Sequence, residues 1–327
     1  MVRIGMASFA HMHAFSYINC VLNNPNAKLI GIWDENEERG KIIAQNYNTK
    51  FYSSYEDLLK EIDGVIICSS NKNHMPLTIK ASEFGIHVLC EKPLATSIED
   101  GRKMLLASEN NKIFLMSAFP VRFAPPAYRV KELIESNVLG KILAIRSSNH
   151  GKMPSGWFID KEEAGGGAIM DHTVHVVDLI RWYTGKEFTS VYAEIDSRLH
   201  PNINIDDCGI LLMTLGDETF VSLDPSWSRP NIFPTWGDVT MEIIGTRGTI
   251  FLDVFAQNIV FYNEEGRIIT YENWGSNMDY GLISAFVDSI MENKYPPVTG
   301  YDGYKAMEVA IAAYLSYERK EPIKLPL

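Results

Sequence analysis

Three side chains able to move a proton stand at two places in this 327-residue chain. Lys92 follows a short apolar run, and Asp171 and His175 follow a triple glycine about eighty residues later. A lysine, a carboxylate and an imidazole can together take the proton of an alcohol while a hydride leaves its carbon. The set therefore suggests oxidation of an alcohol, with a nicotinamide as the hydride acceptor.

The spacing around these residues indicates how the chain holds them. Asp171 and His175 are four residues apart, so a helix would place them on one face, and Asp178 continues that stripe. Pro93 restricts Lys92 to an extended backbone, which presents the lysine at the end of its strand. Simpler explanations stay open: an isolated Asp-x-x-x-His is more often a solvated polar face, and Lys92 could be a surface lysine in a loop.

A metal site would be another explanation of the same histidines. His172 lies between Asp171 and His175, and His11-x-His13 forms a second pair. On a helix, His172 should point away from the other two, and no further ligand is placed by spacing. We therefore expect no metal.

The elements that must position these residues begin with a regular alternation of strand and helix patterns. Strands and helices that alternate along the chain imply right-handed crossovers and a doubly wound sheet. Strands apolar on both faces are typical of a parallel sheet covered by helices. The expected strands span 3–8, 28–33, 64–68, 86–90 and 113–118, with helices at 13–22 and 37–47, a short helix capped by Ser54, and a helix opened by a capping box at Thr96-x-x-Glu99.

The pattern changes after Phe119-Pro120. An amphipathic helix is predicted over 168–183, seven serial strands over 191–271, and two final helices at 280–292 and 301–316. The fold class predicted is α/β: an N-terminal Rossmann domain with a doubly wound parallel sheet over residues 1–120, and a C-terminal α+β domain with a large, mainly antiparallel open sheet over 121–327.

A dinucleotide would lie over the turn from Ser8 to His13, between the first strand and the first helix. The usual G-x-G-x-x-G fingerprint is absent there, so a doubly wound domain without a dinucleotide is an open alternative. Asp34 ends the second strand, where an acidic residue binds the ribose hydroxyls of NAD; NADP is possible, and Arg39 nearby could weaken the preference. The candidate cofactor contacts are Ser8, Phe9, Ala10, His11, Asp34, Ser69, Asn71, His74, Glu91 and Lys92, although Asn71 could instead cap the next helix.

Composition limits the compartment and the partners. The net charge of −11 argues against a nucleic-acid or anionic-membrane partner. The four cysteines form no CxxC pattern, no apolar stretch approaches membrane-spanning length, and the N-terminus has no signal-peptide layout. We expect a cytoplasmic protein.

Several ordered segments resemble the glucose–fructose oxidoreductase, inositol dehydrogenase and rhizopine catabolism (Gfo/Idh/MocA) family. They are Asp63-Gly64-Val65-Ile66-Ile67 with Asn71-x-x-His74, Gly85-x-His87 through Glu91-Lys92-Pro93-Leu94-Ala95, and Gly165-Gly166-Gly167 through Asp171-x-x-x-His175-x-x-Asp178 with the closing Gly185. The resemblance implies that Lys92, Asp171 and His175 form the active site. It also implies an NAD(P)-dependent oxidoreductase acting on a sugar, a polyol or a related hydroxy compound. The glycine-poor loop from Ser8 to His13 departs from the family pattern.

The remaining expectations concern substrate and assembly. Candidate substrate contacts are polar or aromatic groups near the predicted site, a combination that suits a sugar, although such loop residues also form interfaces. They are Arg122, Asn149, Lys152, Trp157 and His172, with His150, Trp227, Arg229 and Trp236 as further loop residues. Two rival functions are a cofactor-binding sensor or regulator, and an enzyme whose tightly held NAD gives net elimination or epimerisation. An open second sheet suggests a homodimer or homotetramer formed through it.

Overall fold

Six parallel strands form the first sheet of the computed structural model, which describes residues 1–327 except 217, 257, 264–266 and 274–276. Their order is β3-β2-β1-β4-β5-β6, which confirms the doubly wound arrangement. The bounds are Val2–Ala7 (β1), Ala27–Trp33 (β2), Lys50–Phe51 (β3), Gly64–Ile67 (β4), His87–Cys90 (β5) and Leu115–Ser117 (β6). Only β3, a two-residue edge strand, was not predicted.

Five α-helices lie in this half of the chain. They are α1 (His13–Asn23), α2 (Glu37–Asn46), α3 (Tyr55–Leu59), α4 (His74–Glu83) and α5 (Ile98–Asn110). The Ser54 side chain caps α3, as expected. The capping box at Thr96 was placed one residue early: Ser97 caps α5 by accepting from the amide of Asp100. Neighbouring serine and threonine offer the same cap chemistry, so the sequence could not separate them.

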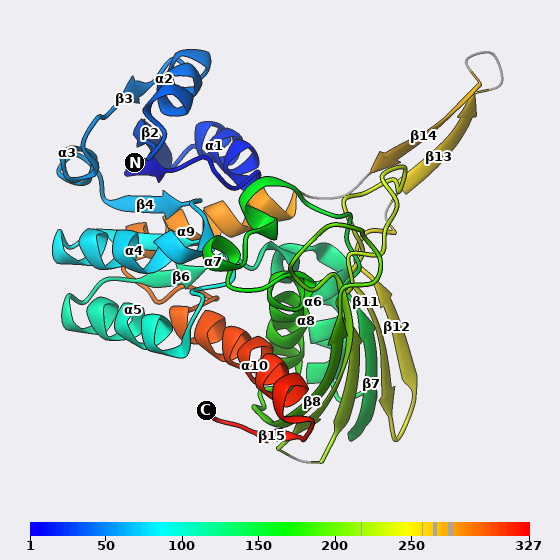
Figure 1. Cartoon of the computed structure of the whole chain (residues 1–327). Coiled ribbons are helices and arrows are strands. Elements are labelled where there is room, and N and C mark those ends of the chain that lie inside the picture. Colours follow the sequence, from blue (N-terminus) through cyan, green and yellow to red (C-terminus); the bar gives the residue numbers. More distant parts are fainter. Residues whose placement is uncertain (217, 257, 264–266, 274–276) are drawn as a thin grey trace.

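The second sheet is mixed and mainly antiparallel. Its order is β12-β11-β7-β10-β9-β8-β15, and β7 with β10 is a parallel pair. The strands are Ile142–Ser148 (β7), Phe188–Asp196 (β8), Cys208–Leu215 (β9), Phe220–Asp224 (β10), Thr240–Gly245 (β11), Thr249–Asp253 (β12) and Ile323–Lys324 (β15). A separate hairpin pairs β13 (Asn258–Asn263) with β14 (Ile268–Asn273) and projects from the body of the molecule (Figure 1).

Helices cover one face of this sheet, and the longest of them are buried. Besides the short helices η2 (Pro120–Phe123), η3 (Gly156–Ile159) and α7 (Lys161–Ala164), this half contains α6 (Pro125–Glu135), α8 (Ala168–Thr184), α9 (Met278–Glu292) and α10 (Gly300–Arg319), whereas the short helix η1 (Asn71–Asn73) belongs to the first half. The amphipathic helix predicted at 168–183 is instead buried on nearly all sides, because α10 and the sheet enclose α8. Gly185 ends it with φ 65°, as a helix-terminating glycine does.

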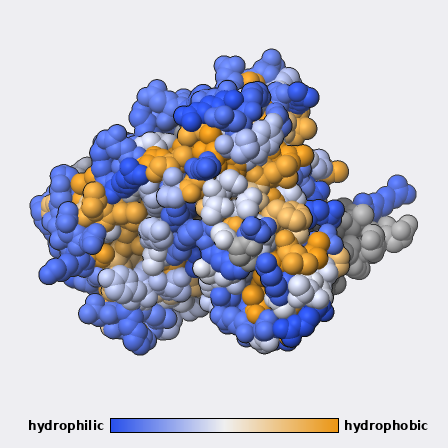
Figure 2. Space-filling model, turned by 90° about the horizontal axis from the view of Figure 1, so that it is seen from below, coloured by the Kyte–Doolittle hydropathy of each residue, from blue (hydrophilic) through white to orange (hydrophobic). Residues whose placement is uncertain are grey.

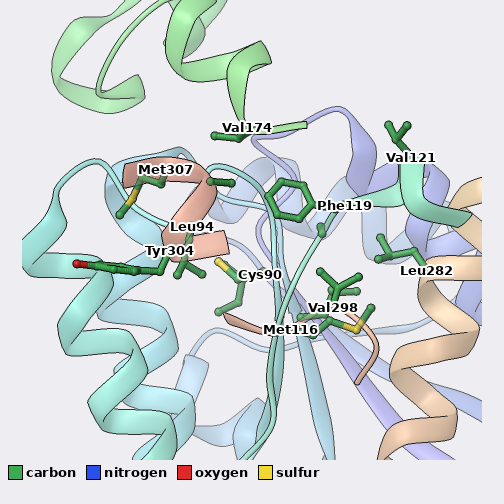
Figure 3. Close-up of a cluster of buried hydrophobic side chains, with 14 of the residues drawn as sticks. Cys90, Leu94, Met116, Phe119, Val121, Val174, Leu282, Val298, Tyr304 and Met307 are labelled. Atoms are coloured by element: carbon green, nitrogen blue, oxygen red, sulfur yellow. The ribbon is translucent and has the colours of Figure 1, made fainter. Parts of the chain in front are cut away.

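The two sheets share one hydrophobic core. Val174 of α8 and Leu282 of α9 belong to the same buried cluster as Met116 and Phe119 at the end of the first sheet, and Met307 of α10 lies against Gly101 of α5 (Figure 3). The predicted C-terminal half therefore contributes helices to the first sheet, and α9 also contacts α1 and β1. The division at residue 120 stays a prediction.

The other face of the second sheet is open. Its exposed side chains include large hydrophobic ones: Ile210, Leu212, Phe220 and Phe251. Seen from below, two lobes are separated by an indentation, and hydrophobic patches lie between hydrophilic margins (Figure 2). Among the described residues, no helix is both long and apolar enough to span a membrane.

Candidate active site

Lys92 lies directly after β5, at the carboxyl edge of the first sheet, where ligands of such sheets bind. Its peptide bond to Pro93 is cis. The ring of His74, at the start of α4, lies behind this turn with Nδ1 2.9 Å from the carbonyl oxygen of Pro93. His74 is fully buried, so it positions the turn and does not face the cavity.

The lysine and the carboxylate predicted as a set meet in the structure. Lys92 Nζ lies 2.5 Å from Asp171 Oδ1, and both side chains are largely buried. The indole Nε1 of Trp227 donates to Asp171 Oδ2 at 3.1 Å. Burial opposes ionisation of Asp171, but Lys92 and His172 outweigh it and hold its pKa well below the usual range. Asp171 is therefore a carboxylate with a fixed orientation.

His172 differs from its prediction. It was expected to point away from Asp171 and to contact substrate; its Nε2 lies 3.2 Å from Asp171 Oδ2, and the side chain is completely buried. The reason is tertiary: Nδ1 lies 3.0 Å from the carbonyl oxygen of Pro225, and Gly151 leaves room for the ring. His172 thus contacts the Asp171 carboxylate and helps to hold its orientation.

His175 is one helical turn beyond Asp171 on α8. Burial, followed by the charge of Lys92, holds its pKa well below the ordinary value, so the ring is neutral. Neither ring nitrogen has a hydrogen-bond partner among the described residues, although the side chain is only 2% exposed. A buried imidazole with two unpaired nitrogens is costly unless something else binds it, which is typical of a ligand site.

A cavity of about 280 Å³ opens in front of Lys92 and Asp171, whereas His175 is not among its lining residues. Lys92 and Asp171 line it from one side, and Lys152 and Trp236 from the second half of the chain. A lining of charged and aromatic groups suits a small polar ligand. Of the predicted substrate contacts, Lys152 is the one placed in this lining.

The other predicted substrate residues have structural partners. Arg122 is buried in a bidentate ion pair with Asp178, at 2.7 and 2.5 Å. Asn149 is buried and donates to the carbonyl oxygen of Asp238. Trp157 donates from Nε1 to the carbonyl oxygen of Ala10 and so joins the second half of the chain to the first loop. None of the three lines the cavity.

The cofactor edge is organised around Asp34. Its Oδ2 accepts from the amide of Phe9 at 2.9 Å and from Arg39 Nε at 2.9 Å. Its Oδ1 accepts from the amide of Asn36 at 2.8 Å and from Arg39 at 2.7 Å. A carboxylate offers about four acceptor positions, and four donors already use them. Ribose hydroxyls would have to displace Arg39.

The first loop is held mainly by its own donors and by its neighbours. Ser8, at φ 72°, donates to Glu35, and its Oγ accepts from the amide of Ala10. The amide of His11 donates to the carbonyl oxygen of Cys68. This loop therefore contains no glycine, and most of its backbone amides already donate hydrogen bonds within the protein.

Two of the predicted cofactor residues, Ser69 and Asn71, follow β4, in a segment that contacts the second half of the chain. Ser69 is buried and donates to the carbonyl oxygen of Ser70, and Ser70 in turn donates to Glu163 at 2.7 Å. Asn71 donates from Nδ2 to the carbonyl oxygen of Ala164, so it does not cap α4. These contacts fix the segment 156–164 over the sheet edge.

The supporting role of Trp227 was missed by sequence reasoning, which offered it only as a loop residue. The one signal is a tryptophan three residues after the half-buried strand β10, and its bond to a residue 56 positions away has no sequence signature.

Comparison with known proteins agrees with this geometry. The model of the oxidoreductase family with an NAD-binding Rossmann fold matches residues 2–119, and the model of the Gfo/Idh/MocA C-terminal domain matches residues 128–251. The chain belongs to the Gfo/Idh/MocA family of oxidoreductases.

Relatives in the Gfo/Idh/MocA family align along almost the whole chain. Myo-inositol 2-dehydrogenase of Thermotoga maritima is 27% identical, over 99% of this chain and 98% of its own length. The NAD-dependent scyllo-inositol 2-dehydrogenase of Bacillus subtilis is also 27% identical, over 98% and 95%. The crystal structure of GenD2 from gentamicin A biosynthesis, a complex with NAD, superposes with a TM-score of 0.91 at 22% identity, covering 100% and 97% of the two chains.

The site fits the NAD that this family binds. Asp34 directly follows β2, and Nε2 of His11 and both ring nitrogens of His175 are buried without a hydrogen-bond partner among the described residues, which is typical of groups that bind a ligand. Asp34 would hold the adenosine ribose, and Lys92 would lie beside the nicotinamide.

Proposed function

We propose that this protein is an NAD-dependent dehydrogenase that oxidises a secondary alcohol of a sugar, a polyol or a related hydroxy compound. The observation that carries the proposal is the buried Lys92–Asp171 pair, 2.5 Å apart, at the edge of a cavity lined by charged and aromatic side chains. The inositol dehydrogenases among the relatives support the substrate class.

Each residue has one task in the proposed mechanism. His175, neutral because of burial, accepts the hydroxyl proton. Lys92 donates to the same oxygen and stabilises its developing negative charge. Asp171, fixed by Trp227, keeps Lys92 in place and orients the substrate. NAD, when bound, supplies the hydride acceptor at C4 of its nicotinamide.

The test is a panel of inositols, sugars and sugar alcohols with NAD, followed by the absorbance of NADH. We expect turnover with at least one cyclic polyol or sugar, and release of NADH. Product formation without released NADH would favour the alternative in which tightly held NAD is reduced and reoxidised in one cycle. Binding of NAD without turnover of any compound would favour the sensor or regulator.

Assembly and compartment belong to the same proposal. The exposed Ile210, Leu212, Phe220 and Phe251 on the open face of the second sheet support a homodimer or homotetramer formed through that face. Four free cysteines are compatible with the cytoplasm. Sedimentation of the wild-type protein and of Phe251→Glu tests the assembly, because a buried charge would dissociate it.

A further inference from the structure

The cofactor has a diphosphate to bind, but the first loop offers few amides for it. In a Rossmann fold the diphosphate lies against loop amides and the start of the first helix. Here the amides of Phe9, Ala10 and His11 donate to Asp34, Ser8 and Cys68, and that of His13 donates to His11 Nδ1 at 3.2 Å. Another positive group must compensate.

That group is His13, the first residue of α1. Its Nδ1 lies 3.0 Å from Oε1 of Glu91, a carboxylate that is 1% exposed, and the ring also lines the cavity beside Lys92. With Nδ1 bound to Glu91, the free position of His13 is Nε2. The first turn of α1 contains no acidic residue, so the helix dipole adds to the same positive end.

We propose that His13, held as an imidazolium by Glu91, binds the diphosphate of the nicotinamide cofactor in place of a glycine-rich cradle, so that cofactor affinity falls as pH rises. This rests on the proposed use of NAD. His13 acts here in binding and not in the chemical step.

The groups around His13 determine its charge. Burial disfavours the charged ring and Lys92 repels it, while Glu91 and, more weakly, Asp279 from α9 attract it; together they raise its pKa. Tyr17 lies 3.5 Å from Nδ1, and Asp279 is bound by Ser16 at 2.5 Å. Because the pKa of His13 is raised, its charge is present below the ordinary histidine value and is lost as pH rises through the raised value.

A metal ion explains the same cluster less well. Ligand atoms of His11, His13 and Glu91 lie within 4.8 Å of one another. The amide of His13 donates to His11 Nδ1, which places the proton of the neutral His11 ring on Nε2, the nitrogen 3.8 Å from Glu91. Burial lowers the pKa of His11 to about 3, so this ring stays neutral. It then has no free lone pair for a metal.

Calorimetric titration with NAD, ADP-ribose and AMP between pH 6 and 9 tests the proposal. For wild type we expect the dissociation constants of NAD and ADP-ribose to rise about tenfold across this range, or about 1.4 kcal/mol, because the charge-assisted bond from His13 is lost. AMP, which has no diphosphate, should change much less. His13→Asn should bind NAD about tenfold more weakly at pH 6, with a flat pH profile. Glu91→Gln should shift the wild-type profile to lower pH.

Matched controls separate the possible failures. His200→Asn changes a histidine on the second half of the chain and should leave NAD affinity and its pH profile unchanged. A carbon-detected titration of the His13 ring should give a pKa that rises when NAD binds. Unchanged affinity and slope in His13→Asn would overturn this role while leaving NAD use intact. If wild type binds none of the dinucleotides, the proposed function fails as well.

Discussion

Asp34 and Asp171 are both buried carboxylates with several donors, but their partners come from different distances along the chain. Asp34 is held by Phe9, Asn36 and Arg39, none more than 25 residues away. Asp171 is held by Lys92 and Trp227, 79 and 56 residues away. The cofactor end of the site is therefore built mainly by local sequence, whereas the reacting end exists only after both halves of the chain have packed together.

The largest effect is expected from a substitution at the reacting end of the site. Lys92→Ala should lower kcat about 1000-fold, because it removes the donor to the developing oxyanion, with NAD affinity within about threefold of wild type. Steady-state NADH formation and NAD calorimetry measure the two quantities. Lys103→Ala, which changes an exposed lysine, is the matched control. Unchanged kcat in Lys92→Ala would remove Lys92 from the mechanism.

The corresponding change at the cofactor end is Asp34→Asn. It keeps the shape of the side chain but removes the charge, so NAD affinity should fall about tenfold or more while kcat at saturating NAD stays near wild type. Calorimetric titration with NAD and with NADP measures the two dissociation constants, and the preference for NAD over NADP should decrease. Equal loss for both cofactors would contradict a ribose contact.

Trp227→Phe tests the long-range support of the reacting end, because it deletes one hydrogen bond and keeps most of the buried ring. Asp171 Oδ2 would lose its indole donor, and kcat should fall about tenfold through misorientation of the Lys92–Asp171 pair. Thermal unfolding checks that the variant is folded. A loss of stability with unchanged kcat would make Trp227 purely structural.

A smaller effect is expected from Arg39→Ala. This variant frees two acceptor positions of Asp34, so NAD affinity should rise a few-fold at the cofactor end. The ion pair is about one-third exposed on the arginine side, so stability should change by less than about 1 kcal/mol. Weaker NAD binding would show instead that Arg39 itself contacts the cofactor.

The smallest expected effect is on the pH profile of kcat, in which His175 should not titrate near pH 6.5. Burial and the charge of Lys92 hold the pKa of His175 well below the ordinary value, so the ring does not take up a proton at the ordinary histidine pKa. At saturating NAD and substrate, kcat should show no acidic limb near pH 6.5. A limb at that pH that disappears in His175→Gln would mean that the ring is more solvated than the structure shows.

The sequence by itself determined the parallel sheet and many element bounds, and it predicted candidate residues for the two ends of the site. These features depend on short-range patterns: apolar strands, serine caps, the Asp34 position and the four-residue spacing of Asp171 and His175. Only the tertiary structure decided that α8 is enclosed, that His172 supports Asp171, that Arg122 pairs with Asp178, and that Trp227 reaches the site. Each of these depends on which side chains from distant segments meet in a low-dielectric interior, and spacing along the chain carries no record of that meeting.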